Sequence, residues 1–297
     1  MKNSNNFIKL NGGLGNQLFQ YSLGLYLSKI KKKIIKYDKS YFTKKIDAPV
    51  IRIDRVFNIK LDEIKKNQLN FKIKFITSRF IIYLFNYINP KILENIGIFI
   101  EKNKMYDERI LEAEKFFYFS GYFQSEKYFL EIKEIILNKI KLKKKLNESN
   151  LILLKKIKKT CSVAVHIRKS DYINNPKFKE IYDVCGQKYY SKAIQIIKKK
   201  LNKPFFYIFS DDVEWVKKNI KFKKNMFLVE LNNKENNHVY DFELMKNCKH
   251  FIISNSSFSW WSCWLGSTKN SIVISPKKWF RDKNQKRNPI LESWLKI

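Results

Sequence analysis

The residues best suited to chemistry follow one short apolar segment. Val163 to Ile167 is an apolar run typical of a buried strand. Ionisable side chains gather at its carboxyl end: His166, Arg168, Lys169 and Asp171. In open parallel α/β sheets ligands bind at the carboxyl ends of strands. A guanidinium can fork onto two phosphate oxygens, and an ammonium acts as a point charge. Arg168 and Lys169 therefore predict a phosphate site.

Three further polar loops occupy comparable positions. Ser210, Asp211 and Asp212 follow the apolar run 205–209. The segment 254–261 marks a change from strand to helix, and its first polar and aromatic residues are Asn255, Ser256, Ser257 and Phe258. Amides and hydroxyls at such a helix start form an anion site. The fourth loop is the glycine-rich turn 12–15, which includes Gly13 and Gly15 and is followed by Asn16.

Each of these loops also has a purely structural explanation. The turn at 12–15 lacks the full G-x-G-x-x-G pattern and its acidic ribose residue. Asp211 and Asp212, taken alone, are more often a helix cap, and the serines at 256–257 can be caps as well. A single histidine is more often a core residue than a catalyst. The meeting of the loops at one predicted edge favours a ligand site, suited to a base, a ribose and a diphosphate rather than to nucleophilic catalysis.

Alternating strands and helices predict an α/β protein with parallel sheets and right-handed crossovers. We expect two Rossmann-like, doubly wound domains, 1–157 and 158–297, that face one another across a cleft. A strand, helix and strand are expected at 7–10, 18–30 and 34–38, and a further helix at 129–140. In the C-terminal domain we expect a helix at 187–201 and strands at 162–167, 205–209, 226–230, 251–254 and 271–275.

The charge balance is strongly basic, with 60 Lys and Arg against 27 Asp and Glu and a net charge of +33. Nucleic acid or an anionic membrane would suit such a charge. The lysines are dispersed, however, which favours a compositional bias with lysine on every solvated face. The run 75–88 is too short and too polar to span a membrane and predicts a core or interfacial helix.

Four scattered cysteines without metal-ligand spacing predict free thiols, and no secretory signal precedes the first strand. We therefore expect a cytoplasmic protein, with peripheral contact at the inner face of a membrane as an open alternative.

Several motifs together resemble the α-1,2-fucosyltransferases of glycosyltransferase family 11, in the bacterial form. They run in the order of that family along most of the chain, at 12–21, 121–129, 166–172, 209–212, 241–245, 255–261 and 275–279. The resemblance implies a GT-B fold, GDP-β-L-fucose as the donor, inversion at the anomeric carbon, and no metal or other cofactor. It also implies that the N-terminal domain lies on the acceptor side and that the C-terminal domain binds the GDP-sugar.

The same resemblance implies roles for individual residues. Arg168 would hold the β-phosphate of the leaving GDP, and His166 and Asp211 would contact the guanine. Ser256 and Ser257 would lie near the diphosphate. The donor-binding set is completed by Gly13, Gly15, Lys169, Ser210, Asp212, Asn255 and Phe258. Lys169 departs from the family motif, which usually carries a second arginine there.

Two points of the mechanism stay open at the level of sequence. Asn16 would approach either the donor phosphate or the acceptor hydroxyl. Asp171 is a candidate for the base that takes the acceptor proton, but it could instead only orient the neighbouring cations. In that second case the leaving phosphate would take the proton.

The expected reaction is transfer of L-fucose to the 2-hydroxyl of a terminal β-galactoside in a surface glycan of lipopolysaccharide or capsule type. Two alternatives remain: a GT-B transferase that uses another GDP-sugar or acceptor, and a basic nucleic-acid-binding protein. The second lacks a recognisable nucleic-acid module.

Overall fold

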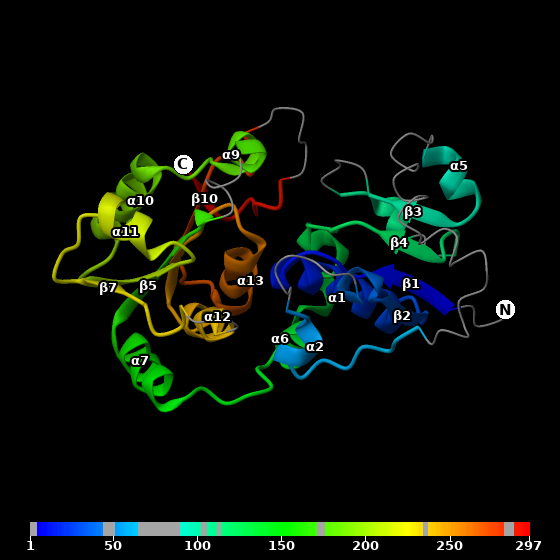
Figure 1. Ribbon diagram of the computed structural model, residues 1–297, viewed down its shortest axis with the longest axis horizontal. Coiled ribbons are helices and arrows are strands. Elements are labelled where there is room, and N and C mark those ends of the chain that lie inside the picture. The colour runs from blue at the N-terminus through cyan, green and yellow to red at the C-terminus, as the bar shows by residue number, and fades with distance from the viewer. Residues whose placement is uncertain are drawn as a thin grey trace. The chain divides into compact units, whose positions relative to one another are not determined.

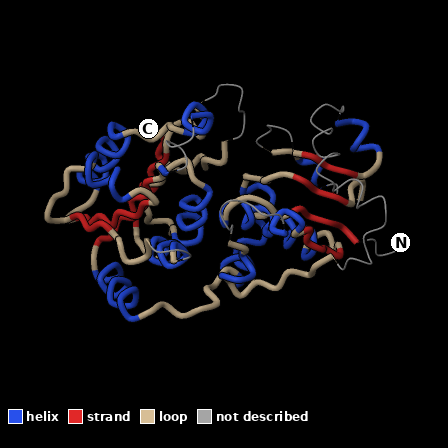
Figure 2. Tube along the Cα trace, viewed as in Figure 1, coloured by secondary structure: helices blue, strands red, loops and turns tan. Residues whose placement is uncertain are grey.

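The computed structural model describes residues 5–43, 51–64, 90–101, 106–111, 114–170, 176–233, 237–281 and 288–297. The chain forms two compact units, Met1–Lys141 and Leu142–Ile297. Each unit contains a parallel sheet with helices, as Figures 1 and 2 show. The α/β prediction is therefore confirmed, and each unit is described in turn.

The N-terminal unit is built on a 4-stranded sheet in the order β2-β1-β4-β3. Its described strands are β1 (Asn5–Lys9), β2 (Ile34–Asp38), β3 (Ile98–Ile100) and β4 (Tyr118–Ser120). Its described α-helices are α1 (Leu14–Lys29), α2 (Ile53–Val56), α5 (Pro90–Asn95) and α6 (Lys133–Lys139). Short 3-10 turns lie at Ser40–Thr43, Glu108–Leu111, Glu126–Tyr128 and Leu130–Ile132.

Helix α1 is the central helix of this unit. It is buried on nearly every side, including the polar side chains of Gln17, Gln20 and Ser22. A helix that is apolar around most of its circumference belongs inside a core. The predicted strand–helix–strand start is confirmed, because β1 and β2 are parallel neighbours joined through α1.

The C-terminal unit contains a 6-stranded sheet. Its strands are β5 (Cys161–Ile167), β6 (Pro204–Ser210), β7 (Met226–Leu228), β8 (His250–Ile252), β9 (Val273–Ser275) and β10 (Leu295–Lys296). Its described helices are α7 (Glu148–Lys159), α9 (Pro176–Tyr182), α10 (Gln187–Lys200), α11 (Val213–Asn219), α12 (His238–Lys246) and α13 (Ser257–Gly266). The five strands expected from the sequence all form, with shifts of a few residues at their ends.

The strand order β7-β6-β5-β8-β9-β10 defines where this sheet can bind a ligand. All the strand pairs are parallel, and the chain moves outward in one direction from β5 to β7 and then returns to β8 on the other side of β5. Such a reversal leaves a crevice outside the carboxyl ends of the two central strands, here β5 and β8. The loops predicted to carry chemistry follow these two strands and β6.

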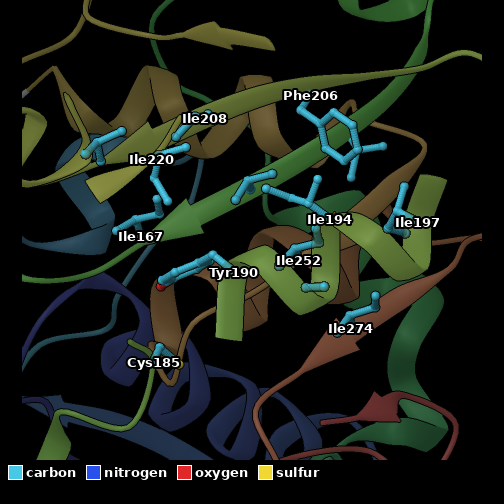
Figure 3. Close-up of a cluster of buried hydrophobic side chains, with 14 residues drawn as sticks. Ile167, Cys185, Tyr190, Ile194, Ile197, Phe206, Ile208, Ile220, Ile252 and Ile274 are labelled. Atoms are coloured by element: carbon cyan, nitrogen blue, oxygen red, sulfur yellow. The ribbon is translucent and has the colours of Figure 1, made fainter. Parts of the chain in front are cut away.

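The core of this unit fixes the sheet against α10. Figure 3 shows Tyr190, Ile194 and Ile197 of this helix beside buried side chains of the strands, among them Ile208 and Ile252. The contact uses the helical spacing that predicted an apolar face on 187–201. Burial of a side chain of this size contributes roughly 1.5–3 kcal/mol. The cluster therefore holds β5 and β6 rigidly, and their loops leave from fixed points.

The boundary between the units lies earlier than the predicted position at 157. Helix α7 packs against α12 and β5 and belongs to the C-terminal unit. Its Leu153 and Ile157 are buried, and Asn150 forms hydrogen bonds with Asn232, at 2.9 Å in each direction. The predicted boundary at 157 falls inside this helix, which spans Glu148–Lys159.

The sequence did not predict the strands β3, β4 and β10. All four cysteines are free thiols, as predicted. Among the described residues no helix is both long and apolar enough to cross a membrane. The helix predicted at 75–88 lies outside the described residues.

Candidate functional site

His166 connects the two sides of the switch point in the C-terminal unit. It is the next-to-last residue of β5, and its Nδ1 atom lies 2.8 Å from the hydroxyl of Ser254, which follows β8. The ring is only 6% exposed and lies 5.6 Å, between ring centroids, from Phe258. Burial lowers the pKa of His166 to about 4; Arg168 lowers it further and Asp211 opposes the shift. The imidazole is therefore neutral near pH 7 and joins two loops of the site.

Asp211 organises the loop that follows β5. Its carboxylate accepts hydrogen bonds from the backbone amides of Lys169, at 2.8 Å, and Ser170, at 3.2 Å, and from the Ser170 hydroxyl. It also forms an ion pair with the Nε atom of Arg168 at 3.3 Å. The Arg168 side chain is 33% exposed. The arrangement fixes the guanidinium at the edge of the sheet, where it can meet an anion.

Lys169 occupies a different environment from its neighbour Arg168. It is 2% exposed, its Nζ atom donates to Asp183 at 2.6 Å, and the ammonium lies 4.8 Å from the centroid of the Trp215 ring. Both interactions draw the charge into the protein. A buried and paired ammonium is not directed at a ligand at the sheet edge, so Lys169 supports this loop in the structure, and its predicted phosphate contact stays a prediction.

The pair Ser210 and Asp212 forms the start of α11. Asp212 accepts a hydrogen bond from the amide of Trp215 at 2.9 Å, and the Ser210 hydroxyl accepts one from the amide of Asp212 at 3.0 Å. These contacts match the capping alternative. Of the predicted polar loop 210–212, Asp211 therefore reaches the loop after β5, while Ser210 and Asp212 shape the turn.

The segment after β8 delivers a helix N-terminus to the same edge. Helix α13 begins at Ser257, and the side chain of its N-cap residue, Ser256, makes no capping hydrogen bond. Asn255 is buried and holds the loop, since its Nδ2 atom donates to the backbone oxygens of Tyr182 at 2.8 Å and Trp279 at 3.0 Å. The first amides of a helix carry partial positive charge and favour anions. Asn255 thus positions the anion-binding element.

His238 belongs to this site and was missed at the level of sequence. It is the first residue of α12, and its ring centroid lies 6.0 Å from that of Phe258. Desolvation, and then the positive charge of Arg168, lower the pKa of His238. None of the sequence motifs includes His238. The sequence indicated it only through its position after the predicted strand 226–230.

The glycine-rich turn of the N-terminal unit is a separate, ordered feature. Gly12 has a φ of +72°, and Gly13 is the extended N-cap of α1, with Gly15 buried in its first turn. The Oδ1 atom of Asn16 accepts a hydrogen bond from the amide side chain of Gln124 at 2.8 Å. This contact joins two of the sequence motifs, 12–21 and 121–129.

Two buried glutamines hold that turn, and sequence reasoning did not single them out. Gln17 donates to the carbonyl of Gly12 at 2.9 Å and to that of Ile51 at 2.8 Å. Gln20 donates to the side chain of Asn11 at 2.6 Å and to the carbonyl of Gly121 at 2.9 Å. Both side chains donate to oxygen atoms of the surrounding loops, and these hydrogen bonds account for polar residues inside α1.

Asp171, the candidate base, lies outside the described residues. Within the described part of the chain, no group of three or more His, Cys, Asp and Glu side chains is placed to hold a metal ion.

Comparisons with known proteins give this geometry its context. The fold resembles that of the NodZ α-1,6-fucosyltransferase solved after soaking with GDP-fucose, with a TM-score of 0.53 and 13% identity over 89% of this chain and 93% of that one. The molecule thus has a GT-B-like fold, as predicted.

The sequence comparisons define the family. The model of glycosyl transferase family 11 matches residues 1–297, and this chain belongs to that family. The chain is 34% identical to an alpha-1,2-colitosyltransferase of Escherichia coli over 97% of each protein. It is also 30% identical to the O-antigen biosynthesis glycosyltransferase WbnK of Escherichia coli, over 97% of this chain and 99% of that protein.

Proposed function

We propose that this protein transfers a 6-deoxy-L-galactose sugar, L-fucose in the first instance, from its GDP-β-linked donor to the 2-hydroxyl of a terminal β-galactoside in a bacterial surface glycan. The observation that carries the proposal is the partly exposed Arg168, fixed by Asp211 at the same sheet edge as the start of α13. The membership of family 11 supports a glycosyl transfer at this edge.

The proposed chemistry uses these groups to stabilise the leaving diphosphate. Cleavage of the bond between the sugar and the phosphate places positive charge on the sugar ring and negative charge on GDP. Arg168 and the first amides of α13 are fixed before reaction, so they stabilise that negative charge without reorganising. The acceptor 2-hydroxyl attacks from the opposite face of the sugar, which inverts the anomeric carbon. No metal is needed for this charge stabilisation.

The acceptor proton has two proposed destinations. Asp171 is the candidate base, and the departing phosphate is the alternative acceptor of the proton. Buried, neutral His166 is a poor candidate because its pKa near 4 leaves it little basicity. We assign acceptor binding to the N-terminal unit, where the motif residue Asn16 lies.

A colitose donor is the second candidate, favoured by the 34% identity to an alpha-1,2-colitosyltransferase. Colitose is L-fucose without its 3-hydroxyl. Comparison of the two donors therefore tests whether the site makes a contact with that hydroxyl. A site that hydrogen-bonds this hydroxyl rejects the deoxy sugar strongly, whereas a pocket that only accommodates it discriminates weakly.

The test is calorimetric titration in EDTA of GDP-fucose and GDP-colitose, with GDP-mannose and UDP-galactose as controls, into the native protein and into Arg168→Ala. We expect selective binding of GDP-fucose, weakened by about tenfold to a hundredfold in the variant. Transfer to a β-galactoside is then measured with the donor that binds.

Three outcomes separate the alternatives. Preferential binding of GDP-colitose would mean that colitose, rather than L-fucose, is the donor sugar. Equal binding of all GDP-sugars would contradict donor selectivity. Undiminished binding to Arg168→Ala would contradict the proposed phosphate contact.

A further inference from the structure

The edge of the C-terminal sheet opposite the candidate site is lined by lysine. In a parallel sheet, the connections that precede the strands share one edge, and those that follow the strands share the other. The five connections preceding β5 to β9 bring the following lysines to the first of these edges: Lys156, Lys158, Lys159, Lys198, Lys199, Lys200, Lys203, Lys221, Lys223, Lys224, Lys249 and Lys269. We call these residues the lysine edge.

Acidic residues are missing from these five connections. The segments 156–160, 198–203, 219–225, 247–249 and 267–272 contain no Asp or Glu. Within the described residues, no ion pair joins one of these twelve lysines to a carboxylate. In the last turns of α11 and α12, which lie next to this edge, Lys217 pairs with Glu214 and Glu230, and Lys246 pairs with Glu243. The site edge differs, since Asp183, Asp211 and Asp212 all lie there. Glu292 precedes β10, at the far margin of the sheet.

Lysines in the last turn of a helix interact favourably with the negative end of the helix dipole. This effect explains the lysines of the edge that lie at the ends of α7 and α10. It does not explain Lys221, Lys223 and Lys224, which lie in the loop between α11 and β7. Figure 1 shows this loop extending beyond the sheet. The pKa of Lys198 is lowered, first by its partial burial and then by the charge of Lys223, so the cations are close enough to repel one another.

Two aromatic side chains are exposed beside these cations. Phe222 is 41% exposed within the same loop, and Phe227 of the edge strand β7 is 42% exposed. Phe222 stands between Lys221 and Lys223 in the sequence. An exposed ring flanked by lysines suits the boundary between lipid headgroups and acyl chains, where the ring enters the apolar layer and the ammonium groups stay with the phosphates.

We infer that the lysine edge, with Phe222 at its projecting loop, is a docking surface for a bilayer that contains anionic phospholipid. The charge complementarity is broad rather than local, since several connections contribute and all the cations are lysine. Lysine acts as a point charge without the fork geometry of arginine, which suits a diffuse anionic surface better than recognition of a single phosphate.

The orientation is compatible with catalysis at the opposite edge. Strand β5 has 7 residues and spans roughly 23 Å at about 3.3 Å per residue. A bilayer on the lysine edge would thus leave the Arg168 edge open to a soluble donor. The inference goes beyond the proposed function and does not depend on the identity of the donor sugar.

The test uses the full chain and vesicles of phosphatidylcholine, alone or with about 30 mol% phosphatidylglycerol, in a flotation assay. The edge variant is the triple substitution Lys221→Gln, Lys223→Gln and Lys224→Gln. The matched control replaces Lys143, Lys144 and Lys145, which are exposed before α7, in the same way and removes the same charge. Phe222→Ser tests the aromatic contribution alone.

We expect the native protein and the control variant to float with the anionic vesicles and not with phosphatidylcholine alone. The edge variant should bind at least about tenfold more weakly, and about 0.5 M NaCl should weaken the native binding. Phe222→Ser should bind less tightly than the native protein. Titration of GDP into each variant verifies that the donor edge is intact.

Four results would overturn the inference. They are binding to neutral vesicles alone, no vesicle binding at all, equal losses in the edge and control variants, and tighter binding to an oligonucleotide that competes with vesicles. Equal losses would assign the effect to net charge, and the last result would identify a nucleic-acid surface instead.

Discussion

Arg168 and Lys169 are neighbours in the sequence, but the structure separates their roles. Arg168 stays partly exposed beside Asp211, while Lys169 turns inward to Asp183 and Trp215. The two cations follow β5 directly and have different partners. A lysine in place of the usual second arginine is therefore a change within the supporting structure rather than in a phosphate clamp.

Replacement of Lys169 by methionine tests this separation of roles. The variant keeps the volume above Trp215 but leaves Asp183 without its ion-pair partner, so the free energy of unfolding should fall by about 1–3 kcal/mol. The dissociation constant for GDP-fucose should stay within about threefold of the native value. Urea unfolding and calorimetry measure the two effects. A large loss of donor affinity with unchanged stability would place Lys169 at the ligand.

The buried carboxyl group of Asp241 should make the stability of the protein depend on pH. Burial raises its pKa from 3.8 to about 7, although the hydrogen bond from Asn232 opposes the shift. The folded protein therefore binds this proton more tightly than the unfolded chain does. The contribution to stability is complete below about pH 4, decreases as the pH rises to about 7, and is absent above that. The loss is at most about 4 kcal/mol at 1.36 kcal/mol per unit.

The variant Asp241→Asn removes this titration and keeps an oxygen that can accept from Asn232. It should be as stable as the native protein near pH 4, and more stable by about 1–3 kcal/mol at pH 8. Urea unfolding at several pH values measures the difference, in which all other titrating groups cancel. A constant difference across the range would show that Asp241 does not titrate there.

At the scale of the element, the turn before α1 depends on its glycines unequally. Gly12 has a φ of +72°, and an added Cβ would lie 2.8 Å from the Nδ2 atom of Asn16. Gly12→Ala should therefore lower the free energy of unfolding by about 1–3 kcal/mol. Gly13 has an ordinary φ of −69° and open space around its Cβ position, so Gly13→Ala should change stability by no more than about 1 kcal/mol. Equal losses in thermal melts of the two variants would contradict this account.

The sequence was most informative where one strand carried its own apolar pattern. The buried run 162–167 predicted β5 almost to its ends. The strands β3, β4 and β10 have two or three residues each. The equally short β7, β8 and β9 were predicted because they fall in a regular alternation of strands and helices, whereas β3, β4 and β10 lie outside that predicted alternation and form because neighbouring strands supply their partners. Periodicity alone does not report such partners.

The same limit applies to the candidate site. The predicted topology placed the loops after β5, β6 and β8 at one edge of the C-terminal sheet, because the carboxyl ends of parallel strands lie at the same edge. It did not distinguish Asp211, which joins two loops, from Asp212, which caps a helix. Nor did it distinguish the structural amide of Asn255 from a ligand contact. These assignments depend on partners from distant parts of the chain, and a sequence without its fold does not specify them.

At the scale of the whole molecule, α7 shows where one folding unit begins. Asn150 of this helix bonds to Asn232, which in turn donates to Asp241 at 2.7 Å, and all three are buried. The network joins α7 to the connection after β7 and to α12. Removal of α7 would expose the apolar surface beneath Leu153 and Ile157 and leave the amide of Asn232 with fewer partners.

Two fragments test the position of the boundary. Residues 142–297 contain all of α7, whereas 158–297, which starts at the boundary expected from the sequence, keeps only its last two residues. Loss of two buried aliphatic contacts, at roughly 1.5–3 kcal/mol each, is a large share of the stability of a small domain, which is typically about 5–15 kcal/mol. We therefore expect 142–297 to unfold cooperatively and 158–297 to show little cooperative transition in urea, followed by circular dichroism. Equal unfolding midpoints for the two fragments would mean that α7 is an appendage and that the C-terminal unit begins at β5.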